Sequence, residues 1–164
     1  SVAKRNLVFT VHIGPACGRD ETCLTSGFEH TGGPDYTSDS EWIWFNGQKQ
    51  GRMQLWRMRA DGSDLQQMTD DDHQNWFPHP SPGGQKVLYV AYESGVTGHP
   101  RFKEVELRIF PASGGQPDIL LEMFGGQGTI NVPCWAPDGN KFAFLRYDRL
   151  DELYLQSCGD PAVD

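Results

Sequence analysis

The sequence lacks long hydrophobic runs and has few basic residues. No apolar stretch approaches the roughly 18–20 residues that a transmembrane helix needs, so membrane insertion is not expected. Asp and Glu number 22 against 14 Lys and Arg, which gives a formal net charge of −8. Because phosphate contacts come from Lys and Arg, this balance argues against a nucleic-acid-binding protein. The first residues also lack a signal peptide's apolar segment. This leaves open a removed leader, a cytoplasmic protein or part of a longer chain.

Cysteine is scarce as well, with four residues and no CxxC pair. The absence of that pair argues against a structural zinc site. Cys17 and Cys23 flank the polar stretch GRDET and could close a small disulfide hairpin or remain free thiols. Cys134 stands in an apolar run, where a buried small hydrophobic residue is expected.

Turn-forming residues, in contrast, are abundant: the chain has 19 Gly and 11 Pro. They argue against a helical bundle and favour many short strands. Three segments align without gaps: PDYTSDSEWIWF (34–45), PHPSPGGQKVLY (78–89) and PCWAPDGNKFAF (133–144). Each begins with Pro, passes through a turn of small residues and continues into an apolar strand. This pattern predicts a β-hairpin in each segment.

A second hairpin pattern follows the first two copies. Strand-like residues 55–58 and 107–110 lead into the turn sequences ADGS (60–63) and ASGG (112–115). Each unit therefore has four predicted strands, which we name a to d in chain order. A four-stranded unit repeated at this spacing is typical of a β-propeller blade. The predicted fold class is an all-β propeller of antiparallel blades.

The repeat resembles that of the TolB-like β-propellers. The resemblance is clearest in VPCWAPDGNKFAF (132–144) and MRADGSDLQQMT (58–69), and it covers about residues 22–148. It implies a six-bladed ring and, by analogy with TolB, a periplasmic location. Turns in the first two copies depart from Pro-Asp-Gly, but they keep small, flexible residues.

Counting strands gives about three blades in one propeller-type domain spanning residues 1–164. Residues 7–11 and 22–26 are predicted as strands c and d of a shared blade within 1–33. Complete blades are predicted at 34–72 and 73–126, and strands a to c of a shared blade at 127–164, with strand c near 152–155. Because known propellers have at least four blades, two copies are expected to form a six-bladed homodimeric ring. The alternative is that the chain is part of a longer propeller.

Blade topology places the b–c and d–a loops on one face. The predicted loops there are 27–33, 46–52, 70–77, 93–103 and 124–131, while the opposite face has only short turns. Since functional loops gather on one side of a rigid scaffold, we expect the binding surface on this face. The candidate ligand-binding residues are His73, Asn75, Trp76, His79, Gln127 and Asn131.

An aromatic ring beside an amide, as in Trp76 and Asn75, suits a sugar or a peptide, but it equally suits core packing. His79 is expected to point into the channel, and with His30, His73 and His99 on the same face it would form an imidazole cluster. Asp71, Asp72 and His73 are weak candidates for binding a divalent cation, and a solvated acidic turn is the alternative. No cofactor is expected apart from such a cation.

The predicted function is a non-enzymatic TolB-like propeller that binds a protein, peptide or small ligand at this face. The alternative is a metal-dependent lyase or hydrolase acting on an anionic saccharide, since some TolB-like propellers are oligogalacturonate lyases. A purely structural assembly module is a third interpretation.

Overall fold

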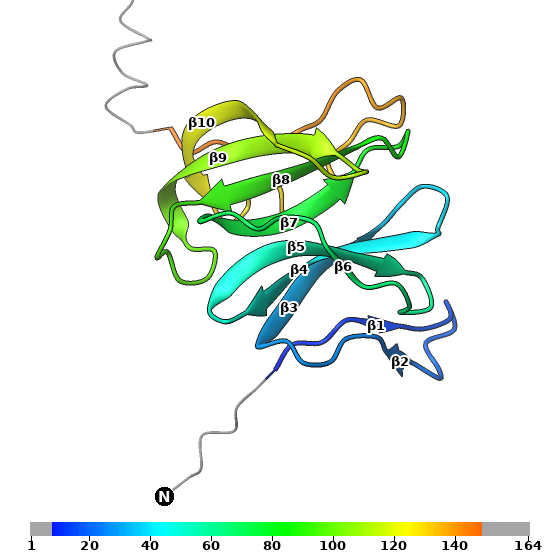
Figure 1. The fold of residues 1–164 in the computed structure, drawn as a ribbon. Helices are drawn as coiled ribbons and strands as arrows, with labels where there is room; N and C mark the ends of the chain where they lie inside the picture. The colour runs from blue at the N-terminus through cyan, green and yellow to red at the C-terminus, as the bar shows by residue number, and fades with distance from the viewer. Residues whose placement is uncertain (1–7, 149–164) are drawn as a thin grey trace, which may run out of the picture.

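The computed structural model describes residues 8–148, which form two four-stranded antiparallel sheets and a two-stranded hairpin (Figure 1). Within this part of the chain there is no helix, and therefore none long and apolar enough to cross a membrane. The all-β architecture of antiparallel four-stranded blades confirms the predicted fold class.

The first sheet has the order β3-β4-β5-β6, with neighbouring strands consecutive in the chain. Its strands are β3 (His30–Tyr36), β4 (Trp42–Lys49), β5 (Arg52–Arg59) and β6 (Gln66–Gln67). The turn between β4 and β5 consists only of Gln50 and Gly51, both with positive φ, as a tight hairpin turn requires. The predicted loop 46–52 is therefore wrong, because most of its residues pair as strand.

The second sheet repeats this arrangement with the order β10-β9-β8-β7. Its strands are β7 (Gln74–Pro80), β8 (Lys86–Tyr92), β9 (Arg101–Pro111) and β10 (Asp118–Gly126). The β8–β9 loop covers residues 93–100 and is shorter than the predicted 93–103, because β9 begins at Arg101. The predicted loop 70–77 likewise ends early, since residues from Gln74 onward belong to β7.

Both innermost strands bend at equivalent positions. The pairing of β3 with β4 shifts between Gly32 and Asp35, and that of β7 with β8 shifts between Trp76 and His79. At the bend, Gly33 and Phe77 both have φ of 56°. A Cβ at Gly33 would lie 2.8 Å from the Asn46 Oδ1 atom, so glycine is required there. The sequence repeat thus extends to a shared backbone irregularity.

The first predicted strand is displaced in part. Residues 7–11 were expected to pair with 22–26. The regular pairing joins β1 (His12–Ile13) to β2 (Thr22–Cys23), and it extends to Val11, whose carbonyl oxygen accepts the Leu24 amide. The cause lies at Phe9, whose carbonyl oxygen accepts hydrogen bonds from the amide and hydroxyl of Thr31. This end of the segment therefore lies along β3. Cys17 and Cys23 are free and exposed, so the hairpin is not closed by a disulfide.

The third predicted hairpin is present in part. Trp135 bridges to Phe142, and the Ala136 amide donates to the Lys141 carbonyl around the Pro-Asp-Gly turn. The strand predicted at 152–155 lies outside the described residues.

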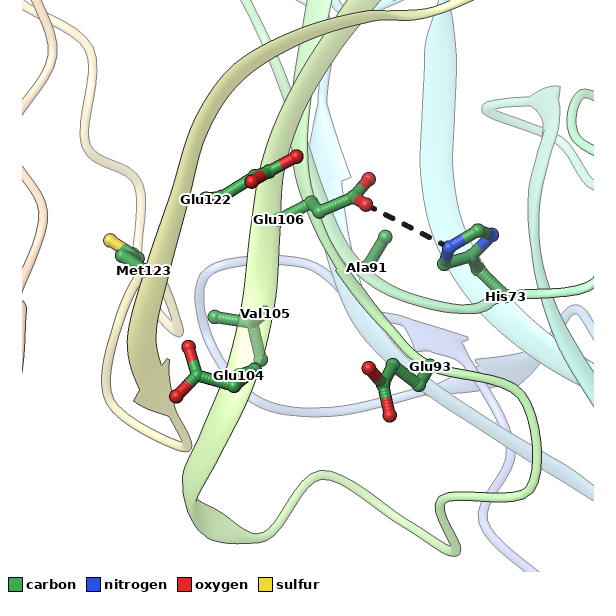
Figure 2. A pocket seen from close by; sticks show the side chains of 8 residues that line it. All are labelled: His73, Ala91, Glu93, Glu104, Val105, Glu106, Glu122 and Met123. Carbon is green, nitrogen blue, oxygen red and sulfur yellow. Dashed lines mark ion pairs between the residues drawn. The ribbon is translucent and has the colours of Figure 1, made fainter.

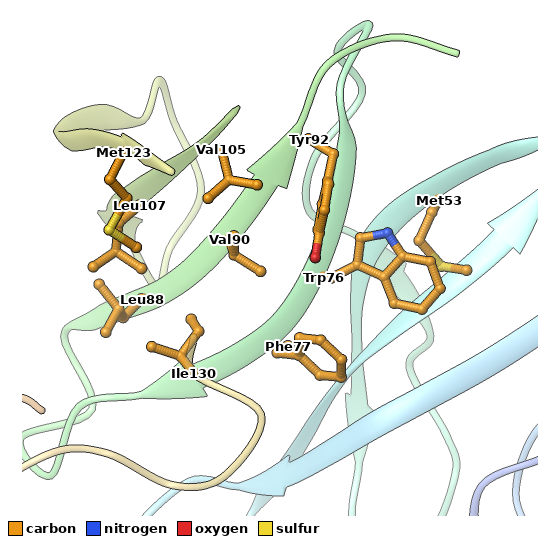
Figure 3. Close-up of a cluster of buried hydrophobic side chains, with 10 residues drawn as sticks. All are labelled: Met53, Trp76, Phe77, Leu88, Val90, Tyr92, Val105, Leu107, Met123 and Ile130. Carbon is orange, nitrogen blue, oxygen red and sulfur yellow. The ribbon is translucent and has the colours of Figure 1, made fainter. Parts of the chain in front are cut away.

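Packing between the units explains why the strands are apolar on both faces. In β4, Ile43 and Phe45 pack toward the N-terminal hairpin, whereas Trp44 packs against the second sheet. In β8, Tyr89 contacts the first sheet, and Val90 belongs to a cluster that includes Ile130 beyond β10 (Figure 3). A strand enclosed by neighbouring blades shows a continuous apolar run rather than alternation.

His79 joins three successive units. Its Nδ1 atom lies 2.9 Å from the Asp35 Oδ2 atom in the first sheet, and its Nε2 atom lies 2.5 Å from the Ile130 carbonyl oxygen. The indole of Trp135, in the third hairpin, donates a hydrogen bond to the His79 carbonyl. His79 is 3% exposed, so these bonds satisfy groups that water cannot reach.

We predict that His79→Ala lowers the free energy of unfolding by about 2–4 kcal/mol, because it leaves the partly buried Asp35 carboxylate and the buried Ile130 carbonyl without their partner. Urea denaturation measures this change. His12→Ala is the matched control, since His12 is exposed on the small hairpin. Equal losses in the two variants would contradict the proposed link between blades.

A second prediction concerns Gly47 in β4, which lies under an aromatic pair. A Cβ at this position would lie 2.6 Å from the Phe28 ring and 3.0 Å from the Trp56 ring. Gly47→Ala should therefore cost about 1–3 kcal/mol through overpacking, measured by thermal or urea unfolding. Gly83→Ala is the control, because its Cβ would meet no atom within 4 Å. An unchanged stability of Gly47→Ala would show that the ring pair can move aside.

Candidate functional site

A cavity of about 600 Å³ opens where the strand ends of the two sheets meet. It lies at the predicted binding face, beside the β4–β5 turn, the β8–β9 loop and the first residues of β3 and β7. We name it the interblade pocket and define it by its lining residues: His30, Gln48, Gly51, Met53, Gln74, Trp76, residues 95–100 and Gln127. Among the described residues, no Asp, Glu, Lys or Arg contributes to this lining.

Two histidines flank Trp76 in this pocket. The His30 ring lies 5.8 Å from the indole and the His99 ring 4.6 Å from it, both in edge-on geometry. Burial and the neighbouring His99 lower the pKa of His30 below its ordinary value, and burial lowers the pKa of His99. Both imidazoles are therefore neutral at pH 7 and present one donor and one acceptor each.

Trp76 and Gln127 are the two sequence-predicted site residues that line this pocket. Trp76 is only 4% exposed, so its face is covered by other rings rather than offered for stacking. Its Nε1 atom is buried without a hydrogen-bond partner among the described residues, as is the Nδ1 atom of His99. Gln127 lies at the exposed rim, where its backbone amide donates a hydrogen bond to the Pro100 carbonyl.

Asn75 and Asn131 have structural contacts instead. Because successive side chains of a strand point to opposite faces, Asn75 points away from Trp76 into a buried polar network. Its amide nitrogen lies within 3.2 Å of the side-chain oxygens of Gln54, Thr69 and Asp71. The Asn131 Oδ1 atom accepts the Gly128 amide at 2.8 Å and shapes the loop after β10.

His73 lies in a separate, acidic pocket of about 310 Å³ on the second sheet (Figure 2). This pocket has an apolar floor and four glutamates: Glu93, Glu104, Glu106 and Glu122. The His73 Nε2 atom lies 3.9 Å from the Glu106 carboxylate. Beneath them, the largely buried Arg108 bonds to Glu106 and to Asp71. Neither His73 nor His79 therefore joins the imidazole cluster expected from the sequence; among the described residues, His30 and His99 are the histidines that line the interblade pocket.

The candidate cation ligands are engaged elsewhere. One Asp71 oxygen pairs with Arg108 at 3.1 Å, and the other accepts the His73 amide at 3.0 Å. Asp72 is exposed. Across residues 8–148, no group of three or more His, Cys, Asp or Glu side chains is arranged to hold a metal ion.

Asp35, His79 and Cys134 occupy the equivalent position of the three aligned repeats, directly after the first proline, and they are the residue types of a nucleophilic triad. The His79 ring nitrogens, however, bond to Asp35 and to the Ile130 carbonyl. Burial, assisted by the Asp35 charge, raises the pKa of the Cys134 thiol to about 11. A protonated, partly buried thiol is a poor nucleophile, and Cys134 behaves as the sequence predicts, as a small apolar residue.

Sequence reasoning missed much of the pocket wall, including Gln48, Gln74 and Met53. Gln48 and Gln74 were assigned to loops, although they belong to β4 and β7. The signal in the sequence that could have located the pocket was the long loop between β8 and β9. This loop makes the second blade longer than the first.

No protein-family model matches the chain. It is 45% identical over 143 residues to the uncharacterised protein Atu1656 of Agrobacterium fabrum, a match that covers 87% of this chain and 49% of that protein. The chain thus spans about half the length of the curated relative it matches.

Among solved structures, a protein of Agrobacterium tumefaciens assigned as TolB superposes with a TM-score of 0.83 and 43% sequence identity. This match covers 86% of the present chain and 51% of that protein. TolB of Acinetobacter baumannii matches with a TM-score of 0.55 and 21% identity over 74% of this chain and 28% of that one, which supports the fold alone. By fold and by sequence, the chain is therefore similar to these TolB proteins and is consistent with about half of a TolB-like propeller.

Proposed function

We propose that the chain is a non-enzymatic binding propeller whose ligand, a protein, peptide or small molecule, docks at the face formed by the b–c and d–a loops. The observation that supports this most directly is the interblade pocket, a 600 Å³ hollow at that face lined from both sheets. Concave sites between rigid elements, with a few polar groups on an apolar wall, are the usual form of ligand sites. By its TolB resemblance we also propose a periplasmic location.

The alternative, a metal-dependent lyase or hydrolase acting on an anionic saccharide, has less support. Its catalytic chemistry would need several ligands around one cation, and the described residues provide no such group. Within the same part of the chain, the pocket lining also lacks a cationic side chain to pair with an acidic sugar.

The pocket can be tested by filling it. Val96 lines it and is half-buried, so Val96→Trp should occupy the space without charging it. We expect that ligands found by NMR screening of uncharged peptides and oligosaccharides shift the Trp76 indole signal, and that Val96→Trp weakens their binding at least tenfold. Leu65→Trp, at an exposed site, is the control. Hits that bind Val96→Trp unchanged would place the site elsewhere.

We further propose that the propeller ring is completed by a second three-blade unit. Exposed apolar side chains at both ends of the described region support this: Val8, Phe9, Val132 and Leu145. Each would otherwise leave apolar surface in water. A second copy of this chain is the partner that the sequence predicts.

Light scattering after gel filtration of the 164-residue chain tests this partner. We expect a mass of twice 18.4 kDa that does not fall on dilution to micromolar concentration. Val132→Asp and Leu145→Asp should shift the mass toward that of one chain, while Gly83→Ala should not. A wild-type mass of 18.4 kDa would contradict the homodimer.

A further inference from the structure

The β8–β9 loop covers one side of the interblade pocket and is fastened there by an aromatic contact. His99, near the end of the loop, packs edge-on against Trp76 at 4.6 Å and Phe77 at 5.0 Å. On the other sheet, His30 packs against the same indole at 5.8 Å and against Phe9 at 4.8 Å. Trp76 therefore lies between two imidazoles that come from different blades.

Hydrogen bonds hold the base of the loop, while its tip carries two glycines and is held by the packing of the half-buried Val96 against the cluster around Trp76. The Pro100 carbonyl accepts hydrogen bonds from the Tyr92 hydroxyl and the Gln127 amide, both at 3.2 Å. At the tip, Gly95 and Gly98 have positive φ, and a Cβ at either would meet nothing within 4 Å. This conformational freedom, immediately before His99, lets the tip move while the base stays in place.

The charges around this contact are few. Within residues 8–148, the pocket lining contains no carboxylate or cationic side chain. Glu29, which precedes His30 in the chain, accepts the Gly51 amide at the rim. Glu93, at the start of the loop, lines the acidic pocket instead. Among the described residues, the two histidines consequently have each other, and no fixed counter-ion, as their ionisable neighbours in the pocket.

We propose that the β8–β9 loop is a pH-operated flap: protonation of His30 and His99 releases the tip of the loop from Trp76 and opens the interblade pocket. Its consequence for ligand binding rests on the proposed function, but the movement itself does not. The ligand that the closed pocket holds is uncharged, because only neutral hydrogen-bonding groups face it.

The physical cause is the cost of placing two like charges in a pocket without a counter-ion. Burial and, at His30, the second histidine already lower both pKa values. When both histidines are protonated at low pH, moving His99 outward costs less free energy than moving His30. The loop that carries His99 contains glycines, whereas His30 is fixed within a paired strand. Hydration of the exposed imidazolium then replaces the aromatic contact.

Stability should follow the same linkage. Unfolded histidines titrate near pH 6.5, whereas the folded His30 and His99 titrate lower. As pH falls below the pKa of the unfolded histidines, the unfolded chain binds more protons than the folded chain does. The free energy of unfolding therefore decreases. The decrease ends once pH passes the folded pKa values, where both states are protonated.

NMR of the ligand-free protein, titrated from about pH 8 to about pH 5, tests the flap. We expect the imidazole signals of His30 and His99, the Trp76 indole signal and the backbone amides of residues 95–99 to shift together, with midpoints below 6.5. Hydrogen exchange of those amides, corrected for the intrinsic pH effect, should be at least tenfold less protected below the midpoint. His30→Gln combined with His99→Gln should abolish the shared transition, while His12→Gln should preserve it.

If His30 and His99 titrate without any response of residues 95–99, the flap is wrong, whatever the double variant does. The flap is equally wrong if the midpoints of the two histidines lie at or above 6.5. Failure of ligand screening alone would count against the proposed function and leave the flap standing, since this titration needs no ligand.

Discussion

The structure depends on the hydrogen bonds that His79 makes across the inner strands. One imidazole connects the Asp35 carboxylate of the preceding sheet with the Ile130 carbonyl of the following unit. Apolar packing between blades is strong but not directional. Directional bonds between buried groups define how each blade sits on the next, because any other register leaves an acceptor unpaired. The shared bend in β3 and β7 positions Asp35 and His79 for this contact.

The bend in β7 also determines which surroundings its polar and aromatic side chains face. Before it, alternating residues send Asn75 into the polar network beneath Arg108 and Trp76 toward the interblade pocket. After it, His79 contacts Asp35 and the Ile130 carbonyl. Asn75, Trp76 and His79 therefore face three different environments. Of these three, Trp76 alone faces the interblade pocket, which suits an uncharged ligand. The acidic pocket on the second sheet has the opposite character, with four glutamates.

Strand existence and blade architecture could be predicted from the sequence, but strand ends could not. Residues such as Gln48 and Gln74 have turn-like polar neighbours, and they still pair as strands because the adjacent strand offers backbone partners. The predicted pairing of residues 7–11 with 22–26 holds at Val11 but not at Phe9, because the Phe9 carbonyl bonds to β3 instead. Of the predicted ligand-binding residues, Trp76 and Gln127 line the interblade pocket, while His73, Asn75, His79 and Asn131 lie elsewhere.

The sequence by itself determined the all-β fold, the four-stranded unit, the TolB-like repeat and the face that carries the long loop. These features follow from local periodicity and turn chemistry, which act over a few residues. The tertiary structure alone decided which polar residues meet. His30 and His99 are far apart in sequence and flank one indole only because two blades place them there. Their low pKa values likewise come from burial between blades, which no local pattern encodes.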